Sequence, residues 1–338
     1  MPVSRLVIAE PFEVGEFSFY PAGEIDLDSL QPKVNQTLED TMRGIESASL
    51  SGQVLREIST SLTAFRLGCL DESALVVFPE NLDQERFSNG SHRDDIAILQ
   101  WLSARVERAL DVVRFDFCDL FSPSELPGVA GSWKGSGGYL GALLHSHADK
   151  QSFLIAGDAV ECSAVVKGIG LLIDTPVRTP LPITAEGEVA GFVIHALTLF
   201  SDAMTSPNET MKFIRCMTLL EFLATPDGYR GWKKLKGDIA CHCARDKASY
   251  LRICERFQEL TSLKDGEGVE RGLRTLLVHQ GRLIPELIPD TRKRRALFRE
   301  LQGYIKRVIG DMIECRAMTW AAYCDRRARL KQALGVAT

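Results

Sequence analysis

The chain has 338 residues, of which 45% are hydrophobic and 25% are charged. This length suits two domains, and the average composition excludes a disordered or fibrous protein. No apolar run approaches the roughly 18–20 residues needed to cross a bilayer, which excludes a membrane-spanning helix. The N-terminus lacks the tripartite pattern of a signal peptide. We therefore expect a cytoplasmic protein with no membrane partner.

The charge is distributed unevenly along the chain. Residues 1–210 contain 14 Lys and Arg against 30 Asp and Glu, a net charge of −16. Residues 211–338 contain 26 against 15, a net charge of +11. Such asymmetry suggests two units with different partners, and the basic unit suits a polyanion such as a nucleic acid. Two domains that dock through opposite charge, or charges that are simply solvated, are the alternatives.

The first half of the chain predicts a mixed domain. Short apolar runs bounded by turn-forming residues indicate strands, and the apolar spacing from Asp94 to Val113 predicts a helix. The glycine-rich residues 131–141 lack the Gly-Lys-Ser/Thr ending of a Walker A loop, and they are typical of a flexible loop. Three prolines in Thr175–Pro182 indicate a linker. The predicted strands are Leu6–Ala9, Glu16–Tyr20, Thr63–Leu67, Ala74–Phe78, Ser152–Ala156 and Ser163–Ile173.

After about residue 187 the apolar spacing becomes helical. Asn208 predicts an N-cap, and Gly281 predicts a left-handed C-terminal cap. The predicted helices are Glu188–Met204, one that follows Asn208 and ends at Pro226, Trp232–Cys243, Asp246–Leu263, Val269–Gln280, Thr291–Glu314 and Arg316–Leu334. We predict an α+β protein: an acidic mixed domain at 1–185 of unknown role, then a basic bundle of five or six helices at 186–338.

Nine cysteines lack regular spacing, so we expect reduced thiols rather than a disulfide framework. The Cys-His-Cys run at 241–243 with Cys254, and the His-Ser-His run at 145–147, have spacings atypical of zinc sites. We therefore expect no metal site and no cofactor.

The sharpest motif is RGLRTLLVHQGR, residues 271–282, which places Arg274 and His279 near a helix end. This pattern resembles the signature of the HEPN superfamily, an arginine followed four to six residues later by a histidine. The upstream helix MKFIRCMTLLEFLA, which contains Glu221, and the segment after the motif are similar to those of ApeA-like and abortive-infection members. The resemblance covers roughly residues 190–320.

The resemblance implies a helical bundle that forms a homodimer, whose joined cleft holds two Arg274–His279 pairs and cuts RNA. It implies a 2′,3′-cyclic phosphate and a 5′-hydroxyl as products. It also implies antiphage defence or a toxin role, with a phage-derived trigger or an antitoxin as partner, and an N-terminal domain that senses or restrains. Many catalytic members carry Asn after the arginine, whereas this chain has Thr275, which keeps a hydroxyl donor. Thr275 and Glu221 are the supporting residues.

The chemistry suits these residue types. Cleaving RNA without a metal requires taking a proton from the 2′-OH and giving one to the leaving 5′ oxygen, and histidine does both near neutral pH. An always-charged Arg274 can stabilise the negative charge that develops on the phosphate. Five residues turn an ideal helix by about 500°, so Arg274 and His279 lie about 140° apart. Either the helix distorts near Gly281 or two protomers pool their pairs.

A basic cluster near the motif predicts a path for RNA phosphates. The alternative is an ordinary solvated helix start, although its positive charge is unfavourable for the helix dipole. The predicted RNA-binding residues are Arg271, Arg282, Arg292, Lys293, Arg294 and Arg295.

Three alternatives remain open at this level. His279 could be a partly buried histidine that bonds a backbone carbonyl. The helical domain could be a catalytically inactive dimerisation module that binds RNA or a partner. The N-terminal domain could be the enzyme, although residues 1–185 contain no recognisable nucleophile, base and orienting group.

Overall fold

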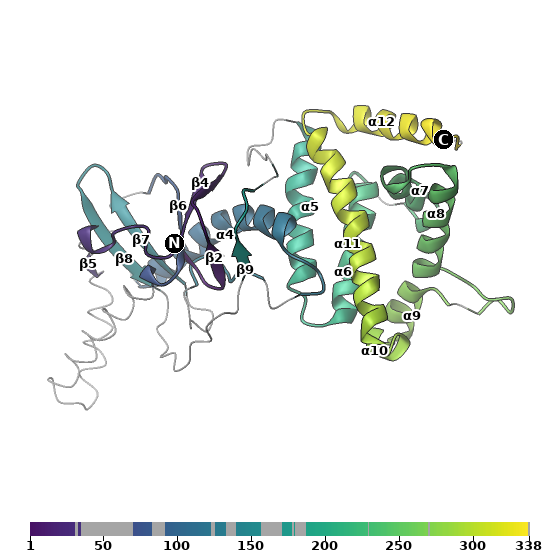
Figure 1. Cartoon of the computed structure of the whole chain (residues 1–338), viewed down its shortest axis with the longest axis horizontal. Helices are drawn as coiled ribbons and strands as arrows, with labels where there is room; N and C mark the ends of the chain where they lie inside the picture. Colours follow the sequence, from purple (N-terminus) through teal and green to yellow (C-terminus); the bar gives the residue numbers. More distant parts are fainter. Residues whose placement is uncertain are drawn as a thin grey trace. The chain divides into compact units, whose positions relative to one another are not determined.

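The computed structural model describes residues 1–30, 33–34, 70–82, 92–122, 126–132, 140–156, 171–177, 179, 187–228, 230–269 and 271–336. The protein is α+β, as predicted, with β-sheets followed by a bundle of helices (Figure 1). The chain divides into two compact units. The N-terminal unit comprises Met1–Cys118 and Ser124–Ile183, and the helical unit comprises Asp119–Pro123 and Thr184–Thr338.

The N-terminal unit is built on short strands. They are β1 (Pro2–Val3), β2 (Leu6–Ile8), β3 (Phe12–Val14), β4 (Phe17–Tyr20), β5 (Lys33–Val34), β6 (Ala74–Val77), β7 (Gly141–Ser146), β8 (Gln151–Ala156) and β9 (Leu171–Ile173). One sheet has the order β1-β6-β4-β3 and is antiparallel. A second pairs β2 with β9 in parallel, and a third has the order β5-β8-β7.

The buried side chains of this unit recur at the spacings expected for strands and helices. Phe17 and Phe19 alternate along β4 with half-buried neighbours, so both phenyl rings face the core. The long helix α4 (His92–Phe117) buries an apolar stripe that includes Val106 and Leu110. A 3-10 turn spans Asp28–Leu30.

Several predicted strands coincide with observed ones. β2, β4, β6 and β8 lie at four of the predicted positions, and β9 forms the end of a fifth. The short strands β1, β3 and β5 and the hairpin strand β7 carry too little local pattern and were not predicted. The predicted strand Thr63–Leu67, residues 163–170 and residues 133–139 of the glycine-rich segment lie outside the described residues.

The helical unit has eight helices in its described residues. They are α5 (Glu188–Met204), α6 (Glu209–Ala224), α7 (Trp232–Cys243), α8 (Lys247–Thr261), α9 (Leu273–Gln280), α10 (Ile284–Leu287), α11 (Thr291–Glu314) and α12 (Trp320–Ala333). Helices α5, α6 and α11 pack side by side, with α7 and α8 next to them (Figure 1). α12 crosses one end of this bundle, whereas α9 and α10 lie at the other. No helix in the described parts of the chain is long and apolar enough to span a membrane.

Caps and apolar stripes explain these helices. The side chains of Asn208, Asp246 and Thr319 each accept a hydrogen bond from an amide three residues later. The central helix α11 buries a stripe at helical spacing, so it packs against α5, α6 and α7. Its buried apolar residues are Leu297, Phe298, Leu301, Ile305, Val308, Ile309, Met312 and Ile313.

Two predicted helix starts are wrong. The helix predicted from Val269 begins at Leu273, because the amides of Arg271 and Gly272 bond back to the carbonyl of Leu263 at 2.6 and 3.0 Å. The helix predicted from Arg316 begins at Trp320, where Thr319 caps it. The short α10 was not predicted, so the bundle has more helices than the predicted five or six.

A short stretch, Asp119–Pro123, joins the helical unit although it follows α4 in sequence. We call it the docked segment. Gln302 accepts from the amide of Leu120 at 2.8 Å and donates to Asp119 at 2.6 Å. The Nζ of Lys212 donates to the carbonyl of Leu120 at 2.6 Å, and burial lowers the pKa of this lysine. The sequence analysis assigns residues 119–123 to the N-terminal domain, 1–185. The two compact units therefore do not meet at one position in the sequence.

Candidate functional site

The helix that carries the motif is fixed at its start by close backbone packing. A Cβ on Gly272 would lie 2.3 Å from the carbonyl oxygen of Thr261, so only glycine allows α9 to approach the end of α8 this closely. Three residues later the hydroxyl of Thr275 donates to the same carbonyl at 2.8 Å. Thr275 therefore uses its donor to hold α9 against α8.

The same helix ends directly after the histidine. Gly281 has a φ of 65°, the left-handed conformation predicted for it, and Arg282 donates from its amide to the carbonyl of Leu276 at 3.2 Å. This cap places His279 in the last turn of α9. Its side chain is exposed and has no hydrogen bond or ion pair to the residues that the structure describes. It is thus unlike the partly buried histidine of the alternative interpretation.

Arg274 is anchored on another helix. Its guanidinium Nη2 lies 3.1 Å from Oε1 of Glu221 in α6, and both side chains are partly exposed. The indole Nε1 of Trp232, at the start of α7, donates to the same carboxylate oxygen. Trp232 in turn stacks on Phe257 of α8. The structure therefore brings Arg274 and Glu221 together, and adds Trp232, which the sequence did not single out.

The predicted phosphate contacts next to the motif are exposed but already paired. Arg271 lies 3.0 Å from Asp265, and Arg282 lies 3.2 Å from Glu286. Exposed pairs of this kind contribute little to stability, so these arginines can exchange their partner for a phosphate at small cost.

The basic start of α11 divides into two kinds of residue. Arg292, Lys293 and Arg295 are exposed. The side chain of Arg294 is only 14% exposed; it lies 2.7 Å from Glu209 and also donates to the carbonyl of Ile288. Arg294 thus fastens α11 to α6, and its burial separates it from the other three.

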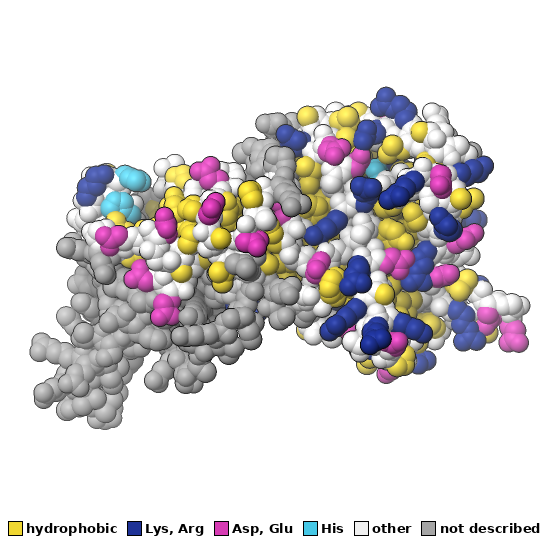
Figure 2. Space-filling view, in the orientation of Figure 1, with side chains coloured by type: hydrophobic (Ala, Val, Ile, Leu, Met, Phe, Trp, Pro, Cys, Tyr) yellow, Lys and Arg dark blue, Asp and Glu magenta, His cyan; other side chains and the backbone are white. Residues whose placement is uncertain are grey.

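Exposed cations continue along α11. Arg299 is exposed and lies over the ring of Phe121 in the docked segment, 5.0 Å from its centroid. Figure 2 shows Lys and Arg side chains along the track of α11 on the face in view. We define Arg292, Arg295 and Arg299 as the basic surface.

A second histidine has a different setting. His242 in α7 is almost fully buried, with Nδ1 3.3 Å from Asp311 and Nε2 accepting from Nε of Arg327 at 3.0 Å. Burial lowers the pKa of His242, and the charge of Arg327 lowers it further. Nε2 accepts from Arg327 and the neutral form is favoured, so this histidine contacts α11 and α12 from within the bundle.

The His, Cys, Asp and Glu side chains of the described residues were compared with the grouping that a metal ion requires. Within those residues no group of three or more His, Cys, Asp or Glu side chains converges to hold a metal ion. Comparison of the chain with family models, curated proteins and solved structures gave no significant match. Its function must therefore be argued from its own residues.

Proposed function

We propose that the protein is a metal-independent endoribonuclease of HEPN type, with Arg274 and His279 from two protomers forming a composite site. The observation that carries the proposal is the arrangement on α9: an exposed histidine in the last turn, and an arginine oriented by Glu221 of a neighbouring helix. An exposed imidazole that has no partner in the described structure is available for proton transfer.

The roles follow from this geometry. His279 takes the proton of the 2′-OH and then gives it to the leaving 5′ oxygen, while Arg274 of the other protomer lies beside the phosphate. Glu221 holds one edge of the Arg274 guanidinium, which leaves other N–H groups to bond the phosphate as its negative charge grows. Thr275, whose donor bonds Thr261, acts by positioning α9 rather than by contacting phosphate.

A homodimer is supported by apolar side chains beside the motif. Val278 is 45% exposed and Leu283 is 49% exposed, and they flank His279 and the cap at Gly281. A second copy of this surface would cover them and bring two exposed histidines together about a two-fold axis.

The basic surface supports RNA as the substrate. Exposed arginines spaced along α11 can neutralise successive phosphates without reading sequence. Arg271 and Arg282 extend the same kind of contact next to the motif. We leave Arg294 out of this set because its guanidinium is buried against Glu209.

By family resemblance, the biological setting is antiphage defence or a toxin role in the cytoplasm. The N-terminal unit would then respond to a phage-derived trigger or an antitoxin.

A second candidate function is a catalytically inactive module for dimerisation and RNA or partner binding. Thr275 favours it, because this residue stands where many catalytic members have Asn and its hydroxyl is already bonded to Thr261.

Cleavage of single-stranded RNA by the purified full chain tests the proposal. We expect wild type to cut with and without EDTA and to leave 2′,3′-cyclic phosphates, and His279→Ala to be inactive. Equal cleavage by both forms would refute the assigned site. RNA binding without cleavage by either form, with the usual fall in affinity as salt rises, would instead support the binding module.

A further inference from the structure

A pocket of about 470 Å³ opens beside the basic surface, at the start of α11. This volume lies within the range of about 300–1,000 Å³ typical of small-ligand sites. The loop after α10 and the facing side of α11 supply its apolar wall. The lining side chains on which the argument depends are Arg256, Ile288, Asp290, Lys293, Ala296 and Glu300.

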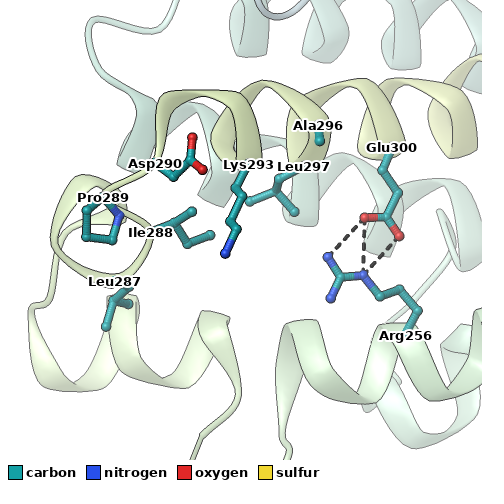
Figure 3. Close-up of a pocket in the computed structure, with 9 residues that line it drawn as sticks. All are labelled: Arg256, Leu287, Ile288, Pro289, Asp290, Lys293, Ala296, Leu297 and Glu300. Carbon is teal, nitrogen blue, oxygen red and sulfur yellow. Dashed lines mark hydrogen bonds and ion pairs between the residues drawn. The ribbon is translucent and has the colours of Figure 1, made fainter.

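The polar groups of the pocket sit at its two ends. Figure 3 shows Lys293 reaching from α11 into the space between Ile288 and the Arg256–Glu300 pair. Among the described residues Lys293 has no ion-pair partner. At the far end, Arg256 bonds Glu300 through Nε and Nη2 at 3.0 Å each, and Tyr304 donates to the same carboxylate at 2.9 Å.

These contacts determine which ligand fits. The two cations, Arg256 and Lys293, are balanced by two carboxylates, Glu300 and Asp290, so the pocket has no net charge to attract a polyanion. It offers instead an apolar wall of aliphatic side chains, a planar ion-paired guanidinium, and both donors and acceptors at its ends. A planar heterocycle with polar edges matches all three features, because bases stack on guanidinium planes and apolar side chains while their edges hydrogen-bond.

We propose that this pocket binds a nucleobase, supplied by one unpaired nucleotide of the RNA that crosses the basic surface. The inference rests on the proposed RNA substrate and adds a base-binding position to it. Ala296, which lines the pocket, is four residues after Arg292 and three before Arg299 on α11, so it neighbours both arginines and a base in the pocket leaves its phosphates beside the basic surface. The same chemistry would accept the base of a free nucleotide, and the experiment separates the two sources.

Binding of fluorescent oligonucleotides to the full chain, in a His279→Ala background that prevents cleavage, tests the proposal. The probes are a single-stranded 12-mer RNA and an abasic ribose-phosphate 12-mer. Ala296→Phe fills the pocket from an exposed position, and Ala321→Phe places the same side chain at an exposed site on α12 as a control. We expect Ala296→Phe to weaken RNA binding about tenfold, the size of one lost stacking contact, with abasic binding unchanged.

Charge variants give a second readout. Lys293→Met should weaken RNA more than the abasic probe, whereas Arg292→Met should weaken both equally because it removes a phosphate contact. Ala296→Phe could abolish the binding of mononucleotides and leave the affinity for the 12-mer RNA unchanged. That result would show that the pocket is a nucleobase site whose ligand is a free nucleotide. Unchanged affinities for every probe in Ala296→Phe would overturn the inference.

The two proposals can fail separately. If wild type does not cut RNA but base-dependent binding needs the pocket, the nuclease proposal fails and this inference stands. If wild type cuts RNA and Ala296→Phe binds both probes as well as the control variant, only the pocket inference fails.

Discussion

Arg274 of α9 and Glu221 of α6 form an ion pair of 3.1 Å, although 53 residues separate them in the chain. Glu221 is thus a positioning residue that sets where the arginine points. Because Trp232 donates to the same oxygen, the carboxylate is held in place as well.

Glu221→Gln keeps an acceptor for Trp232 and removes the charge that orients Arg274. Under the proposed ribonuclease function, we expect kcat for RNA cleavage to fall about 10- to 100-fold with little change in KM, because a misplaced catalytic group costs rate more than binding. The melting temperature should barely change, since a partly exposed pair contributes at most about 1 kcal/mol. Glu286→Gln, which breaks the exposed pair with Arg282, is the matched control. A rise in KM with kcat intact would contradict the positioning role.

Mixing two inactive variants tests whether the site spans two protomers. In the composite model, a heterodimer of Arg274→Ala with His279→Ala keeps one intact pair. Random re-association makes about half of the dimers mixed, so about a quarter of wild-type cleavage should return. Denaturing gels of single-stranded RNA measure this recovery. Absence of recovery, with mixed dimers demonstrated by native mass spectrometry, would show that each site lies within one protomer.

The buried His242 predicts how stability depends on pH. Its pKa in the folded chain lies below its ordinary value of 6.5, so the unfolded chain binds the proton first as pH falls. For the helical unit, which contains His242, the contribution of this histidine to the melting temperature should therefore be constant above pH 7 and decline as pH falls below about 6.5. Burial by itself would raise the pKa of Asp311, but its hydrogen bonds to His242 and Arg326 outweigh burial and lower the pKa, so further loss follows below pH 3.8.

Calorimetry from pH 8 to pH 3 checks this behaviour. His242→Gln should remove the decline that begins near pH 6.5, whereas the exposed His195→Gln should keep it. An identical pH profile in wild type and His242→Gln would assign the decline to other groups.

Arg327 fastens three helices from a buried position. It donates to the carbonyls of Leu223 and Ala224 at the end of α6, at 2.7 and 2.8 Å, and to His242. Its guanidinium also lies 4.8 Å from the ring centroid of Tyr323. Arg327→Met leaves these acceptors buried without their donor, so we expect the free energy of unfolding to fall by about 3 kcal/mol or more.

Urea denaturation followed by tryptophan fluorescence measures the loss. Arg329→Met, an exposed arginine on the same helix, should be nearly neutral. If the two variants were equally stable, the role assigned to Arg327 would be wrong.

The sequence predicted most of the helical unit because its signals are local. The helices Glu188–Met204, Trp232–Cys243 and Thr291–Glu314 lie where apolar spacing placed them. The predicted start of α9 is four residues too early because the amides of Arg271 and Gly272 bond to the carbonyl of Leu263. This contact depends on a residue outside 269–272, so the local sequence does not reveal it. Very short strands such as β1 exist only through pairing with distant partners, so no local pattern predicts them.

The candidate site was predicted in part for the same reason. Arg274 and His279 share one helix, and the cap at Gly281 has a sequence signal. The roles of Trp232 and Arg294 depend on Glu221 and Glu209, which are distant in sequence, so periodicity could not reveal them. The sequence signal for Trp232 is its position at the start of the predicted helix Trp232–Cys243.

The docked segment makes the helical unit discontinuous in sequence. The chain crosses between the units three times, after residues 118, 123 and 183. A fragment starting near residue 186 would lack the groups that bond Lys212 and Gln302, both more than 90% buried. During synthesis the segment emerges well before α6 and α11, the helices that hold it. The basic half of this protein therefore completes its fold only by retaining a piece of the acidic half, and no single cut separates the two.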